Sequence, residues 1–151
     1  MPRQPLPSPR EEIVDTMIDL AHLAKSHRIV VAGNESMGLY VALRRRGFAF
    51  GVLASACRAP CGRHSAGLIA GCGSYQAIEA AVIQISRFLN SAANIAISIE
   101  SQESGLVARV RVKLQQLGFR IEAGARCRGG FVLAAHRHEF GQDFGVIRNA
   151  A

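Results

Sequence analysis

The stretch of sequence that most constrains the fold is the segment 28–39. After Arg28, an apolar run, Ile-Val-Val-Ala, leads directly into Gly33 and then into residues that suit a helix. A strand that enters a helix through a glycine turn places backbone N–H groups and the positive end of the helix dipole at one edge of a sheet. Nucleotide-like ligands commonly bind at that edge. The segment therefore predicts an α/β fold, and it indicates the fold better than the activity.

Hydrophobic periodicity predicts an alternation of helices and strands along the rest of the chain. The expected elements are a helix over 9–25, a strand over 28–32, a helix over 36–46, strands over 49–54 and 66–70, a helix from Ser74 to Leu89, a strand over 95–99, a helix over 104–117, and strands over 119–128 and 131–137. Parallel strands need crossover connections, and right-handed crossovers place helices over the sheet. The alternation therefore predicts a mostly parallel sheet that is covered on both faces.

Local signals mark several element boundaries. Ser8 can cap the first helix, and Pro9 suits its first position. Two helices end in the same way, in Leu-Arg-Arg-Arg-Gly-Phe (43–48) and Leu-Gln-Gln-Leu-Gly-Phe (114–119), where the glycine can adopt a left-handed conformation. The pair Gly129-Gly130 predicts a tight turn between the last two strands.

The size and composition predict a single domain. At 151 residues, with 49% of them hydrophobic, the chain can bury one substantial core. We expect that domain to span 9–137, between a flexible tail over 1–8 and a C-terminal tail over 138–151. No apolar run reaches the roughly 18 to 20 residues of a membrane span, and the proline-rich start lacks the apolar region of a signal peptide. These features predict a cytoplasmic protein whose four cysteines are reduced.

The order of the elements, parallel strands followed by a final reversed one, resembles the Rossmann-like fold of S-adenosylmethionine-dependent methyltransferases. The resemblance covers 28–137 and rests on the strand-turn-helix at 30–39 and on the closing hairpin. It implies a three-layer α/β sandwich, with a mostly parallel sheet and a C-terminal antiparallel hairpin. It also implies that S-adenosylmethionine binds at the first turn, where the candidate residues are Gly33, Asn34, Glu35, Ser36 and Gly38.

The chain departs from the pattern of that family at three places. Glu35 and Met37 stand where further small residues would let the cofactor approach the backbone. The second strand ends without a carboxylate, in Leu-Ala-Ser-Ala-Cys (53–57), although the family binds the ribose hydroxyls with an acidic residue there. The segment before Ala66 is also too short for the usual further strand and helix. These departures predict a shortened, degenerate relative with a weakened cofactor site.

The formal net charge of +7 raises a second class of ligand, nucleic acid. No acidic residue lies between Ser36 and Ile78, and five arginines fall there: Arg44, Arg45, Arg46, Arg58 and Arg63. The alternative is that the arginines at the end of the helix only complement its dipole. The low aromatic content, 6% with no tryptophan, argues against a stacking platform for single strands.

Four residues could form a zinc site. Cys57, Cys61, His64 and Cys72 supply three thiolates and one imidazole, but their spacing matches no strong zinc signature. Buried thiols in a reduced core are the alternative. Ser36 lacks the first flanking glycine of a nucleophilic serine elbow, so we interpret it as a helix cap. Glu35 could serve as a general base, but a first-turn glutamate that favours the helix dipole is the simpler interpretation.

Three classes of function remain. The preferred one is a non-catalytic interaction or regulatory module on a methyltransferase-like scaffold. The alternatives are an active S-adenosylmethionine-dependent methyltransferase and a nucleic-acid-binding protein that uses the arginine surface. The apolar segment 78–90 could also pack against a protein partner or against a second copy in a homodimer.

Overall fold

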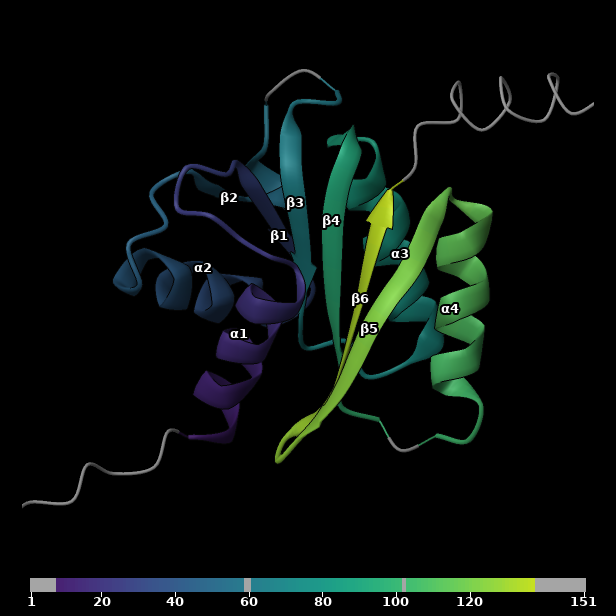
Figure 1. The fold of residues 1–151 in the computed structure, drawn as a ribbon. Helices are drawn as coiled ribbons and strands as arrows, with labels where there is room; N and C mark the ends of the chain where they lie inside the picture. The colour runs from purple at the N-terminus through teal and green to yellow at the C-terminus, as the bar shows by residue number, and fades with distance from the viewer. Residues whose placement is uncertain (1–7, 59–60, 102, 138–151) are drawn as a thin grey trace, which may run out of the picture.

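The computed structural model describes residues 8–58, 61–101 and 103–137 (Figure 1). Its centre is a six-stranded sheet with the order β2-β1-β3-β4-β6-β5. The strands are β1 (Ile29–Ala32), β2 (Gly51–Leu53), β3 (His64–Ile69), β4 (Leu89–Ile99), β5 (Phe119–Cys127) and β6 (Gly130–Arg137). β2, β1, β3 and β4 run parallel, and β6 pairs antiparallel with both β4 and β5. The predicted mixed α/β sheet with a reversed final strand is confirmed.

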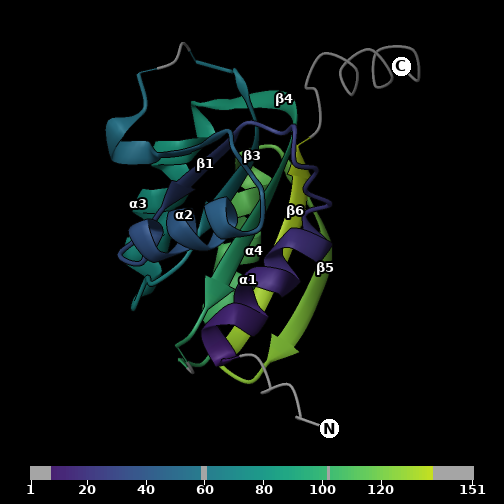
Figure 2. The same ribbon diagram turned by 90° about the vertical axis from the view of Figure 1, so that its left-hand side faces the viewer.

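Two helices cover each face of this sheet (Figures 1 and 2). The helices are α1 (Pro9–Leu20), α2 (Ser36–Arg45), α3 (Tyr75–Ser86) and α4 (Leu106–Gln116), and a short 3-10 turn, η1 (Ala54–Ala56), follows β2. Alternation along β4 shows how the two layers form, because Ile95 and Ile97 pack under α3 and α4 while Ala96 packs under α1 and α2. The result is the predicted three-layer sandwich with two hydrophobic cores, one on each side of the sheet.

The predicted boundary signals fix several of these elements. The hydroxyl of Ser8 accepts a hydrogen bond from the N–H of Glu11 at 3.2 Å, which caps α1. After α2, Gly47 adopts φ +90°, and the N–H of Phe48 returns to the carbonyl of Leu43 at 3.0 Å. Leu43 and Phe48 are both buried in the same core, so this end of α2 is held by packing as well as by hydrogen bonds.

Besides the boundary between α3 and β4, three predicted boundaries are wrong. Helix α1 ends at Leu20 and does not reach residue 25, because the side-chain amide of Asn94 donates to the carbonyl of Ala21 at 2.9 Å and His22 turns the chain with φ 53°. Ser36 is not the cap of α2; Glu35 holds that position and makes no side-chain cap hydrogen bond. The hairpin turn lies one residue earlier than predicted, since Cys127 already pairs with Gly130.

The largest correction concerns β4. The sequence predicts a helix that continues to Leu89 and a strand that begins at residue 95, but α3 stops at Ser86 and β4 begins at Leu89. The guanidinium of Arg137 donates to the carbonyls of Ser86 and Leu89, both at 2.9 Å, and so holds the bend between the two elements. No glycine or proline marks this bend in the sequence.

The remaining predicted boundaries are close. Strand β3 begins at His64, two residues before the prediction, and β2 is shortened because the chain turns into η1 at Ala54. Most of the predicted tail 1–8 and the whole of the predicted tail 138–151 lie outside the described residues. Among the helices that the structure describes, none combines the length and the apolar character needed to cross a membrane.

Candidate binding site at the carboxyl edge of the sheet

A cavity of about 220 Å³ lies where α1 crosses the carboxyl edge of the sheet. It is lined by Pro9, Arg10, Ile13, Val14, Met17, Glu35, Gly38, Leu39, Ala70, Ser98, Glu100 and Gly129. The floor comes from the ends of β3 and β4, one wall from α1, and the other wall from the start of α2. Pockets for drug-sized ligands typically measure about 300 to 1,000 Å³. This cavity therefore suits a smaller molecule.

Strand β4 places two polar side chains in this cavity. Side chains alternate along a strand, so Ser98 and Glu100 share the α1 face with Ala96. Ser98 is fully buried, and its hydroxyl oxygen has no hydrogen-bond partner in the described part of the chain. Buried polar groups are normally paired, so an unpaired hydroxyl in the lining of a cavity marks a place where a ligand atom can bind.

The mouth of the cavity carries three charged groups. The guanidinium of Arg10 binds the carboxylate of Glu35 at 3.1 Å, with the Arg10 side chain 71% exposed. Glu100 lies exposed opposite them. Burial of part of its carboxyl raises the pKa of Glu100, the negative charge of Glu35 raises it further, and Arg10 opposes both effects. The net charge of these three groups is negative when both carboxyls are ionised.

The turn between β1 and α2, where the sequence predicts a cofactor, is closed by the chain itself. Gly33 adopts φ +100°, and a Cβ there would lie 2.0 Å from the carbonyl oxygen of Ala70. That same carbonyl accepts a hydrogen bond from the N–H of Glu35 at 3.2 Å. On its other side, Glu35 fills the space above Gly71, where a Cβ would lie 2.5 Å from the Cγ of Glu35. Gly33 in this turn and Gly71 after β3 thus let the start of α2 and the end of β3 approach each other closely.

The five predicted cofactor residues divide between the turn and the cavity. Glu35 and Gly38 line the cavity, and a Cβ at Gly38 would meet nothing within 4 Å. Gly33, Asn34 and Ser36 do not line it. Ser98 and Glu100 are not among the residues predicted from the sequence, although the pattern Ile-Ser-Ile-Glu at 97–100 places both on one face at the end of a strand.

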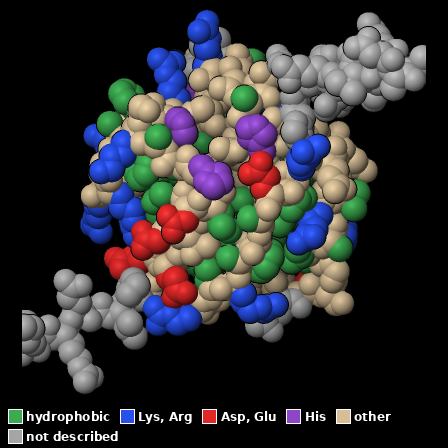
Figure 3. Space-filling model, in the orientation of Figure 1, with side chains coloured by type: hydrophobic (Ala, Val, Ile, Leu, Met, Phe, Trp, Pro, Cys, Tyr) green, Lys and Arg blue, Asp and Glu red, His purple; other side chains and the backbone are tan. Residues whose placement is uncertain are grey.

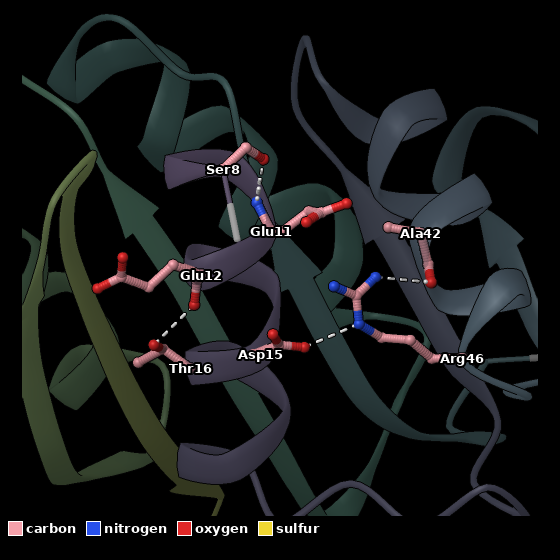
Figure 4. A network of polar contacts seen from close by, with 7 residues as sticks. All are labelled: Ser8, Glu11, Glu12, Asp15, Thr16, Ala42 and Arg46. Carbon is pink, nitrogen blue, oxygen red and sulfur yellow. Dashed lines mark hydrogen bonds and ion pairs between the residues drawn. The ribbon is translucent and has the colours of Figure 1, made fainter. Parts of the chain in front are cut away.

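The five arginines of the predicted nucleic-acid surface lie in different environments. Arg46 spans from α2 to α1, where its Nε donates to Asp15 at 2.8 Å, and its Nη1 donates to the carbonyl of Ala42 (Figure 4). Arg44 donates to the carbonyl of Ala49 at 3.0 Å. The other three, Arg45, Arg58 and Arg63, are exposed. Figure 3 shows acidic side chains gathered over α1, beside the Lys and Arg side chains over α2.

The structure does not bring the four candidate zinc ligands, Cys57, Cys61, His64 and Cys72, together as a group. His64 opens β3 and Cys72 follows the other end of that strand, so the two residues lie toward opposite edges of the sheet. Within the described residues, no three His, Cys, Asp or Glu side chains are grouped so that they could hold a metal ion. Burial raises the pKa of the Cys72 thiol, which disfavours the reactive thiolate.

The segment 78–90, which the sequence suggests as a partner surface, contributes mainly to the core. Ile78, Val82 and Ile85 of α3 are buried against the sheet. Ile83 points outward and is 48% exposed.

Many solved structures share this architecture. A 1,6-didemethyltoxoflavin-N1-methyltransferase from Burkholderia thailandensis, solved with S-adenosylhomocysteine, is similar with a TM-score of 0.60 and 13% identity, over 87% of this chain and 79% of that one. An S-adenosylmethionine-dependent O-methyltransferase from Thermotoga maritima has a TM-score of 0.59 and 12% identity, over 90% of this chain and 68% of that one. A precorrin-6y C5,15-methyltransferase from Geobacter metallireducens has a TM-score of 0.59 and 11% identity, over 84% of this chain and 88% of that one.

The chain has the Rossmann-like fold of S-adenosylmethionine-dependent methyltransferases. At these identities the likeness concerns the fold, and one fold hosts many functions. No protein-family model matches the sequence, and no curated protein matches it. The site therefore has to be interpreted from its own residues.

Proposed function

We propose that this chain is a non-catalytic binding module with a methyltransferase fold, whose ligand site is the cavity under α1. The observation that carries the proposal is the closed turn after β1. The N–H of Glu35 donates to the carbonyl of Ala70, and Gly33 packs against the same carbonyl. A backbone amide engaged in this way is not available to a cofactor.

Two further features support this proposal. Strand β2 ends at Leu53 and continues into η1, whose Ala54 is buried in the core, so the place of the ribose-binding carboxylate holds a packed methyl group. The cavity of about 220 Å³ is also smaller than the pockets that enclose drug-sized ligands, about 300 to 1,000 Å³, although a second hollow of about 680 Å³ adjoins it at Glu100 and Gly129. These features favour a site that does not hold S-adenosylmethionine in the manner of the methyltransferase family.

An active methyltransferase is the second candidate. The observation that favours it is the position of the cavity at the carboxyl edge of the parallel strands, where ligands of open α/β sheets bind. Glu35 and Glu100 would then be the groups available to orient a methyl acceptor.

Calorimetric titration with S-adenosylmethionine and S-adenosylhomocysteine separates the two candidates. We expect no saturable heat at millimolar ligand. Saturable binding that Gly38→Leu removes, and that Gly73→Leu leaves intact, would replace the proposal with the methyltransferase. Both positions have open space where a Cβ would stand, and Gly38 alone of the two lines the cavity.

Nucleic acid or a second copy of the chain would bind to parts of the surface outside the cavity. A role in nucleic-acid binding would depend on Arg45, Arg58 and Arg63, because Arg44 and Arg46 already have partners within the fold. The affinity of such binding would fall steeply as the salt concentration rises. A double variant that carries Arg58→Gln and Arg63→Gln would lose the binding. Light scattering that returns twice the 16.2 kDa mass of the chain would establish a homodimer.

A further inference from the structure

We propose that the cavity under α1 binds a small primary amine with an apolar body, whose ammonium group lies between the Ser98 hydroxyl and the Glu100 carboxylate. This inference rests on the proposed function and names the class of ligand that the module binds. The ammonium donates to both oxygens, and the body of the ligand packs against α1.

The first support is the hydroxyl of Ser98. Its side chain is fully buried at the floor of the cavity, and within the described residues no group donates to or accepts from it. The neighbouring β4 residue on the same face shows the contrast, because Asn94 donates to the carbonyl of Ala21 at 2.9 Å and contacts the imidazole of His136 at 2.7 Å. Asn94 is thus paired within the fold, whereas Ser98 lines the cavity without a partner in the described part of the chain.

The second support is the distribution of charge. Glu35 is paired with Arg10 at 3.1 Å, and as the N-cap residue it also lies at the positive end of α2. Within the described part of the chain Glu100 has no hydrogen bond or ion pair, although the charge of Arg10 acts on it from a distance. Two carboxylates and one guanidinium thus leave one negative charge at the mouth when both carboxyls are ionised, and a cation would neutralise it.

The third support is geometry. Ser98 and Glu100 are two residues apart on one strand, so their Cα atoms are roughly 6.6 Å apart, and one ammonium group can reach both side chains. The remaining lining is mainly aliphatic, from Ile13, Val14, Met17 and Leu39, and these residues would pack against a short alkyl or aromatic group. A carboxylate or phosphate ligand would face two carboxylates, Glu35 and Glu100, and a single guanidinium, Arg10, so the net charge of the mouth disfavours anions.

Titration of the full chain with benzylamine tests the inference, with benzyl alcohol as the uncharged analogue of similar shape. We expect saturable binding of benzylamine, followed by calorimetry or by amide chemical shifts, and binding of benzyl alcohol at least tenfold weaker. Glu100→Gln should weaken benzylamine binding about tenfold or more, and Ser98→Ala about fivefold. Glu122→Gln, which changes an exposed carboxylate on β5 away from the cavity, should leave it unchanged.

Equal binding of the amine and the alcohol would overturn the inference, as would wild-type affinity in both Glu100→Gln and Ser98→Ala. Near-ultraviolet circular dichroism of each variant excludes a folding defect. The result of the benzylamine titration can be distinguished from the result of the S-adenosylmethionine titration that tests the proposed function. Benzylamine binding together with S-adenosylmethionine binding at the turn overturns the non-catalytic assignment alone, whereas no binding of either ligand overturns the amine inference alone.

Discussion

At the scale of single residues, Ser98 departs most clearly from ordinary core chemistry. A buried hydroxyl without a partner costs free energy on folding, because the unfolded chain hydrates it. We therefore expect Ser98→Ala to raise the free energy of unfolding by about 1 kcal/mol in urea denaturation. Ser74→Ala is the matched control with the opposite sign, because the Ser74 hydroxyl caps α3 through the N–H of Ala77 and its loss should cost about 1 kcal/mol. A destabilised Ser98→Ala protein would show that the hydroxyl is paired.

The two glycines at the start of α2 should respond in opposite ways to alanine. At Gly33, φ is +100° and a Cβ would overlap the carbonyl oxygen of Ala70, so Gly33→Ala should lower the free energy of unfolding by about 2 kcal/mol or more. Gly38 lies within the helix with open space at its Cβ, and Gly38→Ala should raise stability by up to about 1 kcal/mol. Thermal unfolding of both variants measures the difference, and similar losses in the two would contradict the closed turn. Substitution of Gly33 is thus a test of folding, and Gly38 is the better position for a test of ligand binding.

At the scale of elements, the sequence predicted the number, order and type of the helices and strands. Its success came from local chemistry, such as the Ser8 cap and the left-handed Gly47. The predicted boundaries are wrong where a residue distant in sequence sets the end of a helix. Arg137 holds the bend after α3, and Asn94 holds the end of α1. Of the residues predicted for a cofactor, Glu35 and Gly38 line the cavity, because the strand-turn-helix that holds them is recognisable in the sequence. The cavity also needs α1 and β4, which only the folded chain brings together.

Helix α1 both stabilises the sheet and encloses the cavity, and a comparison of two buried substitutions can separate these roles. Met17 is fully buried and lines the cavity, whereas Leu114 of α4 is equally buried on the opposite face. We expect Met17→Ala and Leu114→Ala each to lower the free energy of unfolding by about 2 to 5 kcal/mol. Benzylamine binding should weaken in Met17→Ala and remain unchanged in Leu114→Ala, below the unfolding transition of each protein. A weakened affinity in both variants would mean that the loss reflects general destabilisation.

At the scale of the whole molecule, the two faces of the sheet separate stability from binding. The face under α3 and α4 is packed with Ile95, Ile97 and Leu133. The face under α1 and α2 is less completely packed, because it contains the cavity and the unpaired hydroxyl of Ser98. Sites that bind ligands commonly sacrifice local stability in this way. The closed turn after β1 fits the same division, because it joins β1 to β3 and leaves the space beneath α1 as the cavity.

The pH dependence of stability should carry two opposing contributions. Burial lowers the pKa of His64, the hydrogen bond with the backbone of Phe88 opposes this, and Arg28 lowers the pKa further. The unfolded chain then binds the proton first, so stability is present above the ordinary histidine value of about 6.5 and falls as the pH drops below it. Glu100 acts in the other direction, because its raised pKa lets the folded chain take up the proton first, and stability rises as the pH falls toward the ordinary glutamate value.

Urea unfolding between pH 4 and 8 separates these contributions. His64→Gln should remove the loss of stability just below about pH 6.5, and Glu100→Gln should remove the gain at lower pH. His22→Asn is the control, because His22 is exposed and asparagine tolerates its positive φ. The slope of stability against pH is the quantity to compare, since His64→Gln also changes packing against Phe88 at every pH. If His22→Asn flattened the slope as much as His64→Gln, the acid sensitivity would arise from the surface and the burial of His64 would have no part in it.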